Sequence, residues 1–300
     1  MKILVTGGCG FIGSHLVDAL VELQHEVIVI DDCSANNEKF YFNDKVLYHK
    51  VSICDQNKLI NISKGCEFCF HLAAESRLQN AIENPTRAID VNVGGTLNLL
   101  EACKVNNIKG LVFSSTSSIY GLSEEFPITE DNKENCLNPY ASTKYCAELL
   151  LKNYYHMYGI KSCILRYFNV FGERAPTKGQ YALVTGIFLR QKLNNEALTV
   201  VGNGSQERDF IYVKDIIKAN IQCMNSWNNV DSLTKADIFN IGYGKTVKLI
   251  DLARSINDNI ICIEERKGEA INNLSSYDKF FKLTGWVPTT HILEWIKTQY

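Results

Sequence analysis

The chain of 300 residues has no apolar run near the roughly 18 residues that a membrane-spanning helix needs. Neither sign of charge dominates, because 31 Lys and Arg stand against 33 Asp and Glu, for a net charge of −2. Such a balance gives no electrostatic attraction to nucleic acid or to an anionic membrane surface. The apolar segment at the start is too short for a secretory signal. We therefore expect a soluble, cytoplasmic protein with no nucleic-acid or membrane partner.

Cysteine spacing argues against disulfides and structural zinc. There are eleven cysteines, an odd number, and the close pair Cys66 and Cys69 has no second pair to complete a zinc site. Cys69 also stands in a short apolar run that is typical of a buried strand. We expect reduced, mostly buried thiols and no bound metal.

The order of apolar segments predicts the fold class. No repeat and no linker rich in Pro, Gly or Ser divides the chain. Short apolar runs predict strands at Lys2–Thr6, Val27–Ile30, Val46–His49, Phe68–His71, Leu111–Ser114 and Ser162–Leu165. Between them, helices are predicted at Phe11–Leu23, Leu59–Ser63, Ala88–Val105 and Tyr140–Met157. Strands that alternate with helices indicate an α/β protein with a Rossmann-type, doubly wound parallel sheet.

The character of the chain changes after Arg166, where glycine and proline cluster and the pattern becomes irregular. We expect a first domain over residues 1–168 and a smaller α/β region over residues 169–300. The strand-like runs Phe210–Val213 and Ala236–Ile241 lie within the second region. We expect these segments, near 210–215 and 236–244, to return to the first domain, so that the two domains are interleaved.

A glycine-rich loop follows the first predicted strand. Gly7, Gly10 and Gly13 fall between that strand and an amphipathic helix, where exposed backbone N–H groups bind a pyrophosphate. Asp31 and Asp32 follow the second strand, where a carboxylate accepts the ribose hydroxyls of adenosine and repels a 2′-phosphate. The pattern predicts NAD in preference to NADP. A plain turn and a solvated acidic loop are the alternatives.

Several motifs together carry a family resemblance. TGGCGFIGSHL at residues 6–16 is followed, in order, by HLAA at 71–74, NVGGT at 92–96, SST at 114–116, YASTK at 140–144, RYFNVFG at 166–172 and RDFIYV at 208–213. The chain resembles the extended short-chain dehydrogenase/reductase family of NAD-dependent nucleotide-sugar epimerases and dehydratases, and most of all its UDP-glucose and UDP-N-acetylglucosamine 4-epimerases. The resemblance implies tightly bound NAD, a UDP-sugar substrate, and a homodimer formed by the helices at Asn92–Val105 and Tyr140–Met157.

Two Tyr-x-x-x-Lys pairs occur, Tyr41/Lys45 and Tyr140/Lys144. This spacing puts both side chains on one helix face, where a lysine ammonium favours the phenolate. Tyr140 opens a long predicted helix, and Thr116 ends a predicted central strand, whereas Tyr41 lies in a polar stretch and is expected at the surface. By resemblance, Tyr140 is the catalytic base and acid, Lys144 holds the nicotinamide ribose and lowers the pKa of Tyr140, and Thr116 binds the reacting hydroxyl.

The residues after Thr116 separate the reactions known in the family. Dehydratases place an acidic pair there, and decarboxylases place a glutamate two residues on, but this chain has Ser117 and Ser118. The resemblance therefore favours C4 epimerisation of UDP-glucose/UDP-galactose, and of UDP-N-acetylglucosamine/UDP-N-acetylgalactosamine, through a transient 4-keto sugar. A 4,6-dehydratase, a UDP-glucuronate decarboxylase with a displaced acid, and more distantly a non-catalytic NAD sensor remain alternatives.

The resemblance also assigns the remaining contacts. For the cofactor these are Gly7, Gly10, Phe11, Ile12, Gly13, Asp31, Asp32, Ser52, Ile53, Leu72, Ala73, Ala74, Asn92, Ser114, Tyr140, Lys144, Tyr167 and Asn169. For the substrate they are Ser76, Thr116, Ser117, Ser118, Tyr140, Asn169, Thr199, Val200, Arg208, Arg266 and Asn273. Asn273, seven residues after Arg266, stands where a large tyrosine excludes N-acetyl sugars. Whether Ser52 or Asp55 meets adenine, and whether Arg77 meets substrate, stays open.

Overall fold

A computed structural model describes residues 1–35, 39–178, 182–264 and 272–299. Its main sheet has seven parallel strands in the order β10-β6-β5-β4-β1-β2-β3. The strands are β1 (Lys2–Thr6), β2 (Glu26–Ile30), β3 (Leu47–His49), β4 (Phe68–His71), β5 (Gly110–Thr116), β6 (Ser162–Tyr167) and β10 (Lys235–Ile241). The structure confirms the predicted Rossmann-type doubly wound fold.

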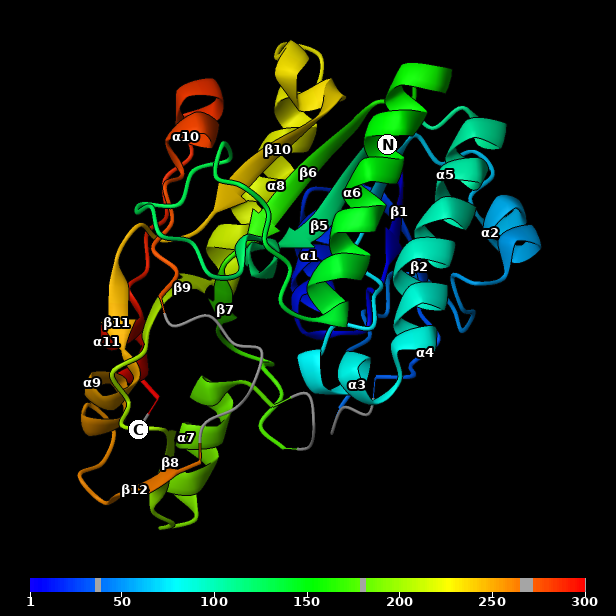
Figure 1. The fold of residues 1–300 in the computed structure, drawn as a ribbon. Helices are drawn as coiled ribbons and strands as arrows, with labels where there is room; N and C mark the ends of the chain where they lie inside the picture. Colours follow the sequence, from blue (N-terminus) through cyan, green and yellow to red (C-terminus); the bar gives the residue numbers. More distant parts are fainter. Residues whose placement is uncertain (36–38, 179–181, 265–271, 300) are drawn as a thin grey trace.

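Helices cover both faces of this sheet (Figure 1). One layer contains α2 (Gln56–Ile62), α5 (Gly95–Asn106) and α6 (Pro139–Tyr158), and the other contains α1 (Phe11–Glu22) and α8 (Val213–Ser226). Side chains of a strand alternate between the faces. Ile3 and Val5 of β1 accordingly belong to one apolar cluster, while Leu4 belongs to the cluster on the opposite face.

The helix expected at Ala88–Val105 begins three residues earlier and contains a π-helical turn. α3 (Leu78–Glu83) is followed by α4 (Pro85–Ile89), and a π-helical turn at Asp90–Gly94 leads into α5. Gly95, the first residue after that turn, packs closely on another segment, since an added Cβ would lie 2.5 Å from the side chain of Ile53. The close approach of these two segments requires glycine.

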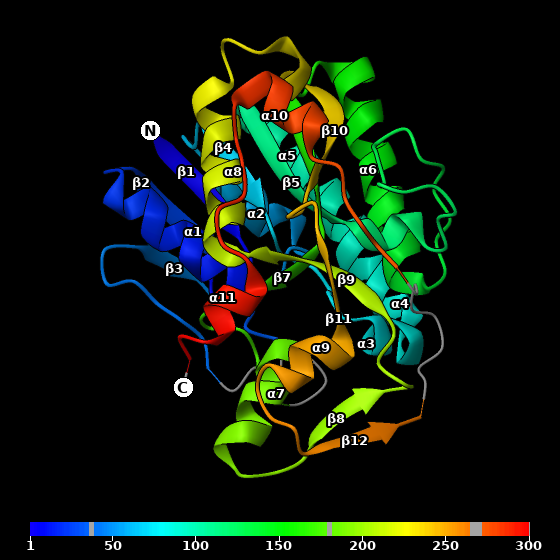
Figure 2. The same cartoon turned by 90° about the vertical axis from the view of Figure 1, so that its left-hand side faces the viewer.

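A second lobe lies beyond the carboxyl ends of the strands (Figure 2). It has a three-stranded sheet of β7 (Asn169–Phe171), β9 (Glu207–Tyr212) and β11 (Thr246–Lys248), and a pair of strands, β8 (Leu198–Val201) and β12 (Ile260–Ile263). Its helices are α7 (Val184–Leu193), α9 (Leu249–Arg254) and α11 (Ile292–Ile296), while α10 (Asp278–Thr284) packs on β10.

The two segments expected to return to the first domain behave differently. Ala236–Ile241 lies in β10, which pairs with β6 in the main sheet. Phe210–Tyr212 instead lies in β9, between β7 and β11 of the small sheet. The chain then re-enters the first domain as a helix, because α8 begins at Val213 and packs against α1.

Candidate active site

A cavity of about 450 Å³ opens between the carboxyl ends of the main-sheet strands and the second lobe. This is the edge at which doubly wound sheets bind ligands. Many of the residues that the sequence predicts for the site line it: Gly7, Gly10, Phe11, Ile12, Gly13, Asp31, Asp32, Ile53, Leu72, Ala73, Ala74, Ser76, Ser114, Thr116, Ser118, Tyr140, Lys144, Tyr167 and Asn169. Lining residues that the sequence reasoning missed include Glu75, Arg87, Pro176 and Leu183.

Other predicted residues are described but lie outside this lining: Ser52, Asn92, Ser117, Thr199, Val200, Arg208 and Asn273. Arg266 lies outside the described residues. Asp55, an alternative to Ser52 for adenine, caps α2 by accepting from the Lys58 N–H at 3.1 Å. The neighbouring Val51 and Ile53 are the residues of that loop that reach the cavity.

The glycine loop brings three backbone segments into contact. Gly7 has a φ of +73°, and a Cβ there would lie 2.6 Å from the backbone N of Ala73. A Cβ on Gly13 would collide with the carbonyl oxygen of Gly7. Only glycine fits at both positions. The first turn of α1, which starts at Phe11, is therefore open to the cavity, as anion binding at a helix N-terminus requires.

Asp31 is fixed beside that loop by two backbone donors. Its carboxylate accepts from the N–H of Cys9 at 2.9 Å and from the N–H of Cys33 at 2.8 Å. Burial raises the pKa of Asp31, and these two hydrogen bonds oppose the shift. The thiols of Cys9 and Cys33 lie within 4.8 Å of the carboxylate, and burial raises the pKa of both, which favours their protonated form.

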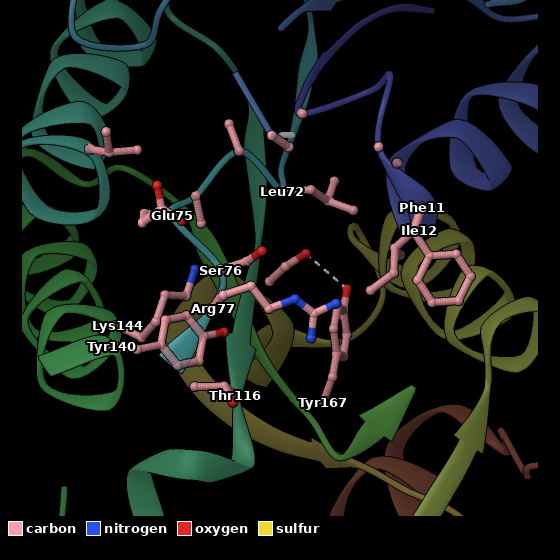
Figure 3. Close-up of a pocket in the computed structure, with 18 of the residues that line it drawn as sticks. Phe11, Ile12, Leu72, Glu75, Ser76, Arg77, Thr116, Tyr140, Lys144 and Tyr167 are labelled. Carbon is pink, nitrogen blue, oxygen red and sulfur yellow. Dashed lines mark hydrogen bonds between the residues drawn. The ribbon is translucent and has the colours of Figure 1, made fainter. Parts of the chain in front are cut away.

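Thr116 and Tyr140 meet at the end of β5. Tyr140 comes from the first turn of α6, which Asn138 caps by accepting from the Ala141 N–H at 2.9 Å. Burial raises the pKa of Tyr140, while a hydrogen bond to Thr116 and the positive charge of Arg77 oppose that rise. The Thr116 hydroxyl also donates to the Ser118 hydroxyl at 3.1 Å. The chain thus holds a phenol beside two hydroxyl groups at the cavity wall (Figure 3).

Lys144 lies one turn further along α6, beside Tyr140 (Figure 3). Burial lowers the pKa of Lys144 to about 7, against a smaller opposing effect of Glu148. Its ammonium group lies 4.0 Å from the centre of the Phe113 ring. The positive charge of Arg77 opposes the rise in the pKa of Tyr140, and the effect of Lys144 on that pKa, which the resemblance implies, stays a prediction.

The other tyrosine–lysine pair takes no part in this arrangement. Tyr41 is half-buried, and the Arg174 guanidinium lies 4.9 Å from its ring. Among the residues that the structure describes, the cavity lining includes neither Tyr41 nor Lys45.

Asn92 anchors the loop that follows β4. Its side-chain oxygen accepts from the Glu75 N–H at 2.8 Å, and its amide group donates to the Glu75 carbonyl at 3.0 Å and to the Thr143 hydroxyl at 2.9 Å. Asn92 therefore joins the cavity loop to α6 between Tyr140 and Lys144. The side chain of Asn92 is buried among these hydrogen-bond partners, so the cofactor contact predicted for Asn92 stays a prediction.

A buried ion pair joins α6 to the main sheet. Arg166 donates to Glu148 at 3.0 and 2.6 Å, and the Ser115 hydroxyl donates to the same carboxylate at 2.5 Å. Ser115 and Arg166 lie on β5 and β6, and Glu148 lies one turn after Lys144. The sequence reasoning did not find this pair. The only features of the sequence that point to it are Glu148, four residues after Lys144, and the charged Arg166 in an otherwise apolar strand.

The residues predicted for the nucleotide end lie on or beside β7, β8 and β9, and so does Asn273, which is predicted for the 2-substituent of the sugar. Asn169 lines the cavity and donates to the Asp209 carbonyl at 2.8 Å, and Asn273 accepts from the Asp209 N–H at 2.9 Å. Arg208 donates to the Glu207 carbonyl at 3.1 Å. Thr199 on β8 is bound to Gln191 of α7. The side chains of Asn169 and Asn273 thus both bind the backbone of Asp209 in β9. Their predicted substrate contacts stay predictions.

Comparison with known proteins agrees with this geometry. The family model described as the NAD dependent epimerase/dehydratase family matches residues 3–242, and the chain belongs to this family. A relative named putative UDP-glucose 4-epimerase, from Methanocaldococcus jannaschii, is 38% identical over 98% of this chain and 96% of its own.

Two solved structures have the same fold. UDP-glucose 4-epimerase from Thermotoga maritima, solved with UDP-glucose, has a TM-score of 0.92 at 32% identity and covers 100% of this chain and 97% of its own. The Thermus thermophilus UDP-glucose 4-epimerase, solved with NAD, has a TM-score of 0.88 at 28% identity and covers 99% and 97%.

The cofactor of this family is NAD, and the residues present fit it. The glycine loop leaves a cradle that a Cβ would fill, Asp31 presents a fixed carboxylate beside it, and Val51 and Ile53 add an apolar wall. In the part of the chain that the structure describes, no helix combines the length and the apolar character needed to cross a membrane.

Proposed function

We propose that this enzyme interconverts the C4 epimers of a UDP-hexose, UDP-glucose with UDP-galactose and UDP-N-acetylglucosamine with UDP-N-acetylgalactosamine. The observation that carries the proposal is the position of the Tyr140 phenol beside Thr116 at the carboxyl end of β5, followed by serines at 117 and 118. A base is present at the reacting hydroxyl, and neither following residue is an acid that would eliminate water or promote loss of carbon dioxide.

In this mechanism Tyr140 takes the proton of the C4 hydroxyl and later returns it. Thr116 accepts or donates a hydrogen bond at the same oxygen and fixes its position. Bound NAD would supply the acceptor and donor for the C4 hydrogen and its electron pair. Lys144, whose pKa burial lowers to about 7, would hold the cofactor ribose through its ammonium form. The sugar ring must turn over between the two transfers, so that its other face receives the hydrogen.

The position of the nearest acids supports epimerisation over dehydration. Glu124 and Glu125, the first carboxylates after Thr116, are exposed and absent from the described cavity lining. Glu75 does line the cavity, but its carboxylate accepts from Asn80 at 3.2 Å and from Arg87 at 3.1 Å. A dehydratase or a decarboxylase would need an acid or a base beside the sugar. The test below distinguishes these activities from epimerisation.

The proposed substrate contacts come from the second lobe and, for the sugar, also from the first domain. Asn169 and Arg208 are assigned to the diphosphate, with Thr199 and Val200 near the uracil, Ser76, Ser117 and Ser118 near the sugar, and Asn273 near the 2-substituent. The position of Asn169 in the cavity lining supports the diphosphate assignment. An asparagine at 273 is smaller than tyrosine, which supports acceptance of N-acetylated sugars.

The test is to incubate the purified protein, without added cofactor, with UDP-N-acetylglucosamine and to follow products by proton NMR and mass spectrometry. We expect the 4-epimer at unchanged mass, because tightly bound NAD copurifies and is regenerated in each turnover. A product that has lost water would instead identify a dehydratase. If neither UDP-N-acetylglucosamine nor UDP-glucose nor UDP-glucuronate reacts although NAD is bound, the enzyme proposal fails and a sensor is favoured.

We propose further that the enzyme is a homodimer built on α5 and α6, which lie side by side on one face (Figure 1). Large apolar side chains on these helices are exposed: Leu97 (39%), Val105 (53%), Leu149 (43%) and Met157 (72%). Exposed apolar clusters of this kind indicate an interface. Light scattering should give a molecular mass twice the chain mass of 33.9 kDa. In a Leu149→Asp variant the measured mass should fall to that of a single chain.

A further inference from the structure

Two cysteines and one aspartate come together at the carboxyl ends of β1 and β2. The strands pair in parallel, with Thr6 opposite Ile30 at their ends. Cys9 follows the first strand and Cys33 follows the second, each by three residues. The two sulfurs and a carboxylate oxygen of Asp31 all lie within 4.8 Å of one another. The fold therefore assembles a group of possible metal ligands from cysteines that are 24 positions apart in the chain.

Hydrogen bonds from the backbone hold the three residues in place. One oxygen of Asp31 accepts from the Cys9 N–H at 2.9 Å, and the other accepts from the Cys33 N–H at 2.8 Å. Cys9 is 1% exposed and belongs to an apolar cluster, whereas Asp31 and Cys33 are partly exposed. A small ion can therefore reach the group past Asp31 and Cys33, while Cys9 closes its inner side.

The ligand atoms determine which kind of ion fits. Thiolate is a soft ligand that favours Zn²⁺, whereas Mg²⁺ and Ca²⁺ are bound by oxygen atoms. Two sulfurs bound to one tetrahedral Zn²⁺ at about 2.3 Å lie about 3.8 Å apart. The three atoms of this group, which already lie within 4.8 Å of one another, need to approach by only roughly 1 Å. They leave the fourth tetrahedral position to water.

Binding of Zn²⁺ would leave the net charge of the group unchanged. Burial raises the pKa of both thiols, so without a metal ion they are protonated and neutral beside the Asp31 carboxylate. Each thiol gives its proton to solvent as its sulfur binds the ion. Two thiolates and one carboxylate around Zn²⁺ then carry the same single negative charge as before. Asp32 and the exposed Lys50 act on Cys33 with opposite charges.

The same carboxylate is the one assigned to the ribose of the cofactor. Asp31 lines the cavity beside the glycine loop that contains Cys9, and neither cysteine is among the described lining residues. Each oxygen of Asp31 already accepts one backbone N–H, so an ion bound there would take a lone pair that the ribose hydroxyls need. Movement of Cys9 toward the ion would also shift the loop that meets the pyrophosphate. Metal and cofactor should therefore weaken the binding of each other.

We propose that Cys9, Asp31 and Cys33 form a binding site for Zn²⁺, and that Zn²⁺ in this site weakens the binding of NAD. The site goes beyond the proposed function, because it needs no substrate and involves neither Tyr140 nor Thr116. Its effect on the cofactor rests on the assignment of Asp31 to the ribose. Zn²⁺ is thus an inhibitor of this enzyme and not a resident cofactor.

The experiment titrates the purified enzyme, which retains its cofactor, with zinc chloride. Bound zinc is measured by equilibrium dialysis, and released NAD is measured in the filtrate. We expect a single Zn²⁺ per chain at this site and a release of NAD that added NAD reverses. At a free Zn²⁺ concentration ten times its Kd, the apparent Kd of NAD should rise about tenfold.

Three variants locate the bound ion. Cys9→Ser and Cys33→Ser should each weaken Zn²⁺ binding by more than about 100-fold, because loss of a residue that only supports a metal ligand already costs roughly 10- to 100-fold. The control is Cys262→Ser, which removes an exposed thiol from β12 in the second lobe. It should bind Zn²⁺ as the wild type does.

The outcomes separate this inference from the proposed function. Equal Zn²⁺ binding in the wild type, Cys9→Ser and Cys33→Ser overturns the site and leaves the epimerase proposal standing. Zn²⁺ that binds through both cysteines while NAD retention stays unchanged overturns the effect on the cofactor. If Cys9→Ser fails to fold, Cys33→Ser and the competition between Zn²⁺ and added NAD on the wild type still decide. Absence of epimerisation in the metal-free enzyme defeats the proposed function alone.

Discussion

Replacing Glu148 with glutamine should destabilise the enzyme strongly, because it breaks a buried ion pair. The side chains of Glu148 and Arg166 are both 0% exposed, and the carboxylate also accepts from Ser115. Breaking such a pair by changing one partner costs about 3–5 kcal/mol. Arg166 keeps a contact with Glu134 at 3.2 Å, so we expect the lower end, about 3 kcal/mol. Calorimetry should show Tm lowered by roughly 5 °C, because the unfolding entropy of a 300-residue chain is large.

Two further variants test this reasoning. Glu134 is 28% exposed, and Glu134→Gln should cost less than about 1 kcal/mol. The double variant Glu148→Leu/Arg166→Met removes both charges and should recover most of the loss, since an apolar pair replaces a buried ion pair at little cost. A double variant as unstable as Glu148→Gln would refute the view that the uncompensated charge of Arg166 causes the loss.

Glu148→Gln also has an effect on the active site. The charge of Glu148 raises the pKa of Lys144, which burial holds at about 7. Without that charge the pKa of Lys144 falls further. If activity needs the ammonium form, the fall in kcat with rising pH should begin at a lower pH in Glu148→Gln than in the wild type. An unchanged pH profile would limit the role of Glu148 to stability.

Four other predictions follow from the site. Tyr140→Phe should lower turnover by at least about 100-fold while NAD stays bound, and wild-type turnover would eliminate Tyr140 as the base. Asp31→Ala should weaken retention of NAD and reduce discrimination against NADP, as measured by cofactor content after purification; an unchanged preference would contradict the ribose assignment. Asn273→Tyr should lose N-acetylated substrates selectively, and an equal loss of both substrate types would refute the gate. Burial lowers the pKa of His71 to about 3 in the folded protein, whereas the pKa in the unfolded chain is about 6.5. Between these two pH values the unfolded chain therefore binds one more proton than the folded protein. The free energy of unfolding should therefore fall as pH drops below about 6.5. In His71→Gln, the slope of this free energy against pH, measured by urea denaturation, should be shallower by about 1.4 kcal/mol per pH unit. Equal slopes in the variant and the wild type would contradict a neutral, buried His71 ring.

The sequence predicted the sheet well, because parallel strands buried on both faces leave continuous apolar runs. β1 and β4 have the predicted bounds, and β2, β3 and β10 differ from them by one residue. Helix boundaries were less accurate where a polar cap opens the helix. α2 begins at Gln56, three residues before the predicted Leu59, because Asp55 caps a first turn that has no apolar signal. The need for glycine at position 95 depends on contact with Ile53, 42 positions away in the chain, which no local pattern reveals.

The candidate site was predicted best where function depends on backbone shape and spacing. Gly7, Gly13, Thr116, Tyr140 and Lys144 all reach one cavity, because the carboxyl ends of parallel strands share an edge. Side-chain direction was the harder part. A residue in a family motif can turn inward and bind the scaffold, as Asn92 does, and a residue just after such a motif can point across the cavity, as Arg77 does. Both directions depend on contacts made on folding.

The place of β10 in the sheet has a consequence for the synthesis of the protein. β10 completes the sheet beside β6, yet roughly 70 residues separate the end of one strand from the end of the other, which a ribosome adds in roughly 4–15 s. Throughout that interval the emerging first domain has β6 as an open edge, and open edges pair with strands of other chains. Nascent chains that stall within residues 168–234 should therefore be the aggregation-prone species, and a chaperone that covers this edge should act before the second lobe is complete.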